Sequence, residues 1–139
     1  MIVNGTSGVV ASRKGEVDSA LGAAKLDLPV KLTSSGDTLD ISIDPATGIA
    51  GDGVVWLVTF IDRADVEIER GENEGKTVAY TQIVTGRQVV GMWEPDTGTH
   101  LKLPLSEVLS DRANGAVVMV QQERAGLPGK ILGAASFTQ

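Results

Sequence analysis

The stretch Val54-Val55-Trp56-Leu57-Val58-Thr59-Phe60 carries apolar side chains at almost every position. Successive residues of a β-strand point to opposite faces of the sheet, so a strand of this composition has apolar side chains on both faces. Such strands are typically buried on two sides. The stretch therefore predicts a central strand, and the similar run at residues 116–120 predicts a second one.

The segments around this stretch alternate between apolar and polar residues or are rich in β-forming residues. They predict further strands at residues 30–32, 39–43, 65–69, 76–93, 100–103 and 130–137. Residues 30–43 are expected to form a hairpin around Ser34-Ser35-Gly36-Asp37, and residues 76–93 to form two strands or one strand bent near Gly86. Many short strands separated by turn residues are typical of an antiparallel β-sandwich, which is the fold class we expect.

One helix is predicted near the N-terminus, at residues 13–25. Ser12 is a suitable N-cap, and apolar residues follow at helical spacing, namely Val17, Ala20, Leu21 and Ala24. Gly15 and Gly22 each destabilise a helix by about 1 kcal/mol relative to alanine. The helix should therefore need a closely packed neighbour. A short helical turn is also expected at residues 105–112, beginning at Ser106.

Composition excludes several classes of function. The chain of 139 residues has no cysteine and a single histidine, His100, so it offers no disulfide, thiol nucleophile, iron–sulfur cluster or Cys/His zinc site. Its 18 acidic and 12 basic residues give a net charge of −6, which argues against nucleic acid as a partner. No apolar run reaches the ~20 residues of a membrane-spanning helix, and Met1-Ile2-Val3-Asn4-Gly5 lacks the pattern of a signal peptide.

The stretch Gly71-Glu72-Asn73-Glu74-Gly75-Lys76-Thr77 is similar to the phosphate-binding loop of nucleotide-binding proteins. It is one residue too short, it contains two acidic residues, and a strand rather than a helix is expected to follow it. We interpret it as an ordered hairpin loop that is structural or faces a partner. The candidate residues of this loop are Arg70, Gly71, Glu72, Asn73, Gly75, Lys76 and Thr77, with left-handed backbone expected at Gly71 and Gly75.

Acidic residues form two other candidate sites. Asp65, Glu67 and Glu69 would share one face of a strand and could hold a cation. An exposed acidic face is the favoured interpretation, with Arg63, Arg87 or Lys102 as its ionic partners. A second group surrounds a glycine-rich loop and consists of Asp40, Asp44 and Asp52, but it lacks the spacing of a calcium loop and favours turns. We expect no metal site and no cofactor.

No set of residues has the spacing of a catalytic site. His100 has serines and aspartates elsewhere in the chain, but no G-x-S-x-G stretch exists to expose a nucleophile. Trp56 and Trp93 are expected to pack in the core or on the sheet. The pattern [Asp/Glu]-Pro-X-Thr-Gly occurs at residues 44–48 and again at residues 94–98. We interpret it as one type of turn used twice.

The order of these segments resembles a bacterial family of unknown function that is related to thioredoxin, DUF1223. The resemblance rests on Val55-Trp56-Leu57-Val58-Thr59-Phe60, on Val66-Glu67-Ile68, on Arg70-Gly71-Glu72-Asn73-Glu74-Gly75-Lys76-Thr77-Val78-Ala79-Tyr80 with Ile83-Val84, and on Ile131-Leu132-Gly133-Ala134-Ala135. In that family a thioredoxin-like domain with a Cys-x-x-Cys segment precedes a β-rich domain. The resemblance implies that residues 1–28 correspond to the last strand and helix of a thioredoxin-like domain, and residues 29–139 to the β-sandwich.

The resemblance implies a function without catalysis in this chain, because the family's redox cysteines are absent from it. We expect an accessory domain that packs on a thioredoxin-like domain, upstream or in trans, and that is secreted or periplasmic. Two alternatives stay open. One is a module that binds a divalent cation or a small ligand, and the other is a hydrolase that uses His100.

Overall fold

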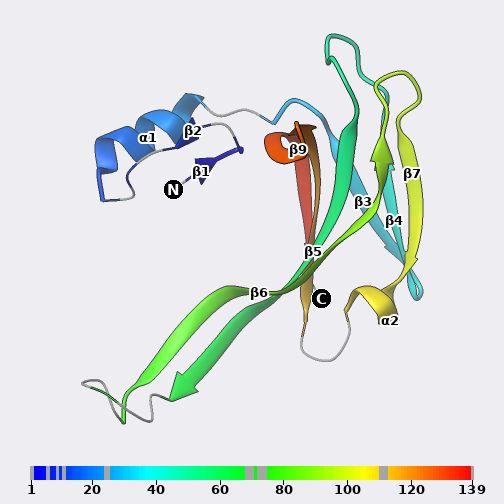
Figure 1. Ribbon diagram of the computed structural model, residues 1–139. Coiled ribbons are helices and arrows are strands. Elements are labelled where there is room, and N and C mark those ends of the chain that lie inside the picture. The colour runs from blue at the N-terminus through cyan, green and yellow to red at the C-terminus, as the bar shows by residue number, and fades with distance from the viewer. Residues whose placement is uncertain are drawn as a thin grey trace.

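The computed structural model describes residues 2–5, 7–8, 10, 12–23, 26–67, 71, 75–109 and 113–138. These residues form two antiparallel sheets and a small N-terminal unit (Figure 1). One sheet has three strands in the order β3-β4-β7, and the other has four in the order β6-β5-β8-β9. The expected fold class, a mainly β antiparallel sandwich with an N-terminal helix, is confirmed.

The three-stranded sheet contains the predicted hairpin. Its strands are β3 (Val30–Ser35), β4 (Thr38–Ile43) and β7 (Thr99–Pro104). β4 is the middle strand and alternates strictly, so that Leu39, Ile41 and Ile43 are buried. A one-turn helix, α2 (Leu105–Val108), follows β7 and adds Val108 to the core. The helical turn thus begins one residue before Ser106, and residues 110–112 of the predicted turn lie outside the described residues.

The four-stranded sheet has the two predicted central strands at its centre. β5 (Gly53–Glu67) and β8 (Gly115–Arg124) pair with each other, and they are flanked by β6 (Thr77–Trp93) and β9 (Leu127–Thr138). The strand predicted at residues 65–69 is not separate, because β5 continues through Glu67. Residues 77–93 form one strand, in which pairing with β5 shifts register between Thr59 and Phe60 and between Val55 and Trp56.

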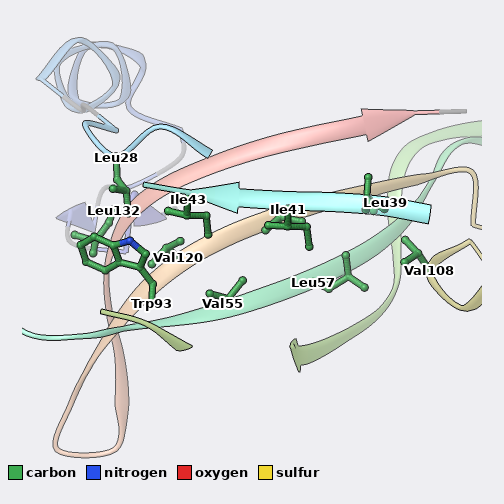
Figure 2. Packing of buried hydrophobic residues seen from close by; sticks show 12 residues of the cluster. Leu28, Leu39, Ile41, Ile43, Val55, Leu57, Trp93, Val108, Val120 and Leu132 are labelled. Atoms are coloured by element: carbon green, nitrogen blue, oxygen red, sulfur yellow. The ribbon is translucent and has the colours of Figure 1, made fainter. Parts of the chain in front are cut away.

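The core lies between the two sheets and is continuous (Figure 2). Leu39, Ile41 and Ile43 of β4 face Val55 and Leu57 of β5. Trp93 closes one end of this layer together with Leu28 and Leu132, and Val108 lies at the other end. Trp93 is fully buried, and its Nε1 donates a hydrogen bond to the backbone oxygen of Asp44 at 3.1 Å.

The N-terminal unit, residues 2–23, consists of the two-residue strands β1 (Ile2–Val3) and β2 (Ser7–Gly8) and the helix α1 (Lys14–Ala23). The helix agrees with the prediction within the described residues, since residues 24 and 25 lie outside them. The unit contacts β9, because the Ile131 N–H donates to the Asn4 backbone oxygen at 2.9 Å. No helix among the described residues is long and apolar enough to cross a membrane.

Candidate functional site

A long arm extends from one end of the sandwich. We define the arm as residues 61–67 of β5 and 77–83 of β6, which pair in register from Ile61 with Ile83 to Glu67 with Thr77. Pairing between β5 and β8 ends at Phe60 and Gly115, so in the described residues the arm is a ribbon of two strands. Figure 1 shows this ribbon leading away from both sheets. The predicted loop connects its two strands and therefore lies at the tip of the arm.

The tip loop, residues 70–77, is described in part. Gly71 and Gly75 have positive backbone φ angles of 102° and 82°, as predicted for left-handed turn positions. Both glycines are exposed, and so are Lys76 and Thr77. The other candidate residues of the loop lie outside the described residues, namely Arg70, Glu72 and Asn73, together with Glu74.

The tip loop is not followed by a helix. β6 begins at Thr77, directly after Lys76. A phosphate-binding loop requires a helix at this point, because the free backbone N–H groups and the dipole of the helix face the anion. The strand that follows the loop is the one predicted from the sequence, and the loop therefore lacks the structural context of a nucleotide site.

The acidic residues do not form a metal site in the part of the chain that the structure describes, where no group of three His, Asp or Glu side chains has the necessary proximity. Glu67 is exposed at the end of β5, the side chain of Asp65 is not described, and Glu69 lies outside the described residues. Two of the basic residues predicted to accompany them lie elsewhere. Lys102 is opposite Asp40 in the three-stranded sheet, and the guanidinium of Arg87 lies 5.2 Å from the ring centre of Trp56.

His100 lies on the solvent-facing side of the three-stranded sheet. It is opposite Ser42 in the register of β4 and β7, and its Nε2 is 4.0 Å from Oδ1 of Asp40. A serine, a histidine and an aspartate are therefore neighbours, which alternation along the strands alone did not indicate. The His100 side chain is 61% exposed, and its distance to Asp40 exceeds that of a hydrogen bond. The arrangement has the residue types of a hydrolase but not its geometry.

The two [Asp/Glu]-Pro-X-Thr-Gly turns lie against each other. The Ala46 N–H of the first turn donates to the Pro95 backbone oxygen of the second at 3.1 Å. Together the turns line an open groove of about 780 Å³, formed by Pro45, Ala46, Thr47, Gly48, Ile49, Pro95 and Asp96. The sequence identified both turns, but it gave no signal that they would be in contact. Among the described residues that line the groove, Asp96 alone carries a charge, so they do not combine an acid with a base or a nucleophile with its activating partner.

These features define a β-sandwich domain with a projecting arm and without an assembled catalytic centre in its described residues. The chain matches the family described as protein of unknown function (DUF1223) over residues 1–121, and it therefore belongs to this family. The DUF1223 family named from the sequence is thus confirmed, while its relation to thioredoxin stays a prediction. No curated protein matches the chain.

A solved structure is similar to almost the whole chain. It is the crystal structure of protein AGR_C_4864 from Agrobacterium tumefaciens, a structural genomics target, with a TM-score of 0.78 and 26% sequence identity. The match covers 97% of this chain but 59% of the Agrobacterium chain. The chain therefore spans less than two thirds of the length of that protein.

Proposed function

We propose that this chain is a non-catalytic accessory domain that packs on a thioredoxin-like domain, in the same polypeptide or in trans, and presents the tip loop to it. The proposal includes a periplasmic or secreted location. The observation that supports it most directly is the arm. An isolated two-stranded ribbon is marginally stable in water, so an arm of seven residue positions in each strand gains from a partner surface that holds it.

The N-terminal unit also supports this proposal. It contains two short strands followed by a helix, and the resemblance implies that a last strand and a helix end the thioredoxin-like domain. None of its described side chains belongs to the buried core of the sandwich. A unit of this size cannot bury a core of its own, and a larger domain that included it would supply one.

The test uses the part of the Agrobacterium protein that this chain does not match, produced as a separate polypeptide. Because the chain has no cysteine, Lys76→Cys allows a single fluorophore to be attached at the tip. We expect saturable binding in fluorescence anisotropy, and we expect Gly71→Val to weaken it by distorting the loop. Gly36→Val is the matched control, since it alters a left-handed glycine in the turn between β3 and β4. Absence of binding, or equal effects of the two variants, would contradict the proposal.

A further inference from the structure

The two sheets differ in the character of their solvent-facing sides. On the three-stranded sheet this side is polar, with the residues Lys31, Thr33, Asp40, Ser42, His100 and Lys102 in paired positions. This is the usual character of the exposed face of an antiparallel sheet. The four-stranded sheet is different, and we call its side away from the three-stranded sheet the outer face.

The register identifies the residues of the outer face. Val55, Leu57, Val118 and Val120 belong to the core, so their neighbours along the same strands point the other way. The outer face therefore includes Trp56 and Val58 of β5 and Met119 of β8. On β6 the positions paired with Phe60, Trp56 and Val54 are Val84, Val89 and Met92. These three side chains are 62%, 53% and 52% exposed.

The outer face thus has three exposed apolar side chains on β6 and half-buried ones at Trp56, Val58 and Met119, although Val54 and Phe60 are buried. Exposed apolar side chains grouped on one face mark interaction sites in soluble proteins. Its composition points the same way, since tryptophan, methionine and arginine are enriched in protein interfaces. Trp56 is half-buried, and the Arg87 guanidinium lies over its ring at 5.2 Å. Two residue types that often dominate binding energy thus lie together in the middle of the face.

The N-terminal unit and the connection after it carry further uncovered apolar side chains. Val10, Leu21 and Leu26 are 50%, 56% and 44% exposed. Figure 1 shows the N-terminal unit and the arm leaving the sandwich towards the same side, away from β3, β4 and β7. The N-terminal unit therefore lies on the side of the sandwich that is opposite the three-stranded sheet, which is also the side of the outer face.

We propose that the outer face is the docking surface for a second globular domain, the counterpart of the part of the Agrobacterium protein that this chain does not match. The inference rests on the proposed function and names the surface that the partner covers. The Agrobacterium chain contains the length for such a domain, because the match spans 59% of it. A second domain that extended the β1–β2 sheet would cover both the N-terminal unit and the outer face. A second copy of this chain has no strand or core to offer to the N-terminal unit, so it would leave that unit uncovered.

The test measures the accessibility of single cysteines to a thiol reagent. Val89→Cys reports on the outer face, Thr33→Cys on the polar side of the other sheet, and Lys76→Cys on the tip of the arm. The probe is the separately produced, unmatched part of the Agrobacterium protein, titrated onto each variant after circular dichroism has shown native strand content. At saturation we expect labelling of Val89→Cys to slow by about tenfold or more, as for a residue in the water-excluding centre of an interface, and labelling of Thr33→Cys to stay constant.

Each outcome separates this inference from the proposed function. Protection of Lys76→Cys without protection of Val89→Cys would support contact at the tip and overturn docking at the outer face. Protection of Val89→Cys alone would support docking and contradict the role of the tip loop. Slower labelling of Val89→Cys as the chain itself is concentrated, without the probe, would show that a second copy covers the face and would overturn the inference. No protection at either position would overturn both.

Discussion

Trp93 and Trp56 lie on opposite faces of the same sheet, and this difference sets how much each side chain contributes to stability. Trp93 is fully buried with its indole N–H bonded to the Asp44 oxygen, whereas Trp56 is half-buried on the outer face. Trp93→Ala should lower the free energy of unfolding by about 3–5 kcal/mol. Trp56→Ala should cost clearly less, whereas the apolar run at residues 54–60 predicted a core-like loss of about 3–5 kcal/mol for this variant. Urea unfolding measures both, and equal shifts of the two midpoints would contradict this assignment.

Gly98 occupies a turn in which a side chain has no room. Its φ angle is 70°, and a Cβ atom there would lie 2.5 Å from the Ile43 oxygen and 2.8 Å from the Pro45 nitrogen. Gly36 has a similar φ angle of 59° but open space around it. Both glycine-to-alanine variants carry the backbone penalty of about 1–2 kcal/mol, and Gly98→Ala should cost a further ~1–3 kcal/mol from steric overlap. Thermal or urea unfolding of both variants measures the difference between their losses of stability, which is the steric cost at Gly98. Identical losses would show that Gly98 is not in contact with the backbone of Ile43 and Pro45.

The sequence predicted individual buried residues well where alternation was strict and less well elsewhere. Leu39, Ile41 and Ile43 were identified from period-2 spacing and are buried. Trp56 could not be distinguished from Trp93, because an apolar run such as residues 54–60 does not reveal which face meets the second sheet. The proximity of His100, Ser42 and Asp40 also depends on the pairing of β4 with β7. Such pairings between distant segments have no local sequence signal.

The arm is the element whose length was least predictable. Separate strands were expected at residues 54–60 and 65–69, but residues 65–67 continue β5. The residues between these two predicted strands, Ile61-Asp62-Arg63-Ala64, do not alternate between apolar and polar side chains, so they showed no strand periodicity. Backbone pairing with β6 keeps them extended in spite of this, because hydrogen bonds between strands do not depend on apolar side chains.

Shortening the arm should leave the sandwich intact. In the shortened variant an Asn-Gly turn replaces residues 64–80. The turn then connects Arg63 to Thr81, which are paired in the register. Since the removed part has no third strand in the described residues, we expect the free energy of unfolding to change by no more than about 1 kcal/mol. Urea unfolding of the shortened variant measures this change. In the unshortened chain, the backbone amides of residues 61–67 should exchange hydrogen faster than those of residues 54–58. A large loss of stability would mean that the arm packs on the sandwich.

The tip loop should not bind nucleotides. It is shorter than the phosphate-binding motif by one residue and leads into β6 instead of a helix. Isothermal titration of the purified chain with magnesium-ATP and magnesium-GTP is expected to show no saturable heat. Micromolar binding that disappears in Lys76→Ala would show that this interpretation of the loop is wrong.

At the scale of the whole molecule, the two sheets share one core, whereas the N-terminal unit stands outside it. The core contains residues of β4, β5, β8 and β9, so both sheets should unfold in a single cooperative transition. The sequence predicted the sandwich class because that class follows from strand number and spacing. It did not predict the outer face, because an apolar position is interpreted as buried until the order of the strands shows which side of the sheet lies away from the core.

The boundary between the N-terminal unit and the sandwich should lie just before Leu28. Leu28 is 2% exposed, its N–H donates to the Leu132 oxygen at 3.1 Å, and any side chain at position 133 would collide with the Leu28 backbone. A chain that begins at Leu26 keeps these contacts and loses the bond between Asn4 and Ile131. Its free energy of unfolding should therefore fall by only about 0.5–1.5 kcal/mol.

A chain that begins at Val30 also loses Leu28, and the additional loss should be about 2–5 kcal/mol. Leu28→Ala in the full chain is the matched control and should reproduce most of that difference. Equal stability of the two shortened chains would place the boundary after Leu28, and a large loss on removal of residues 1–25 alone would show that the N-terminal unit is part of the sandwich.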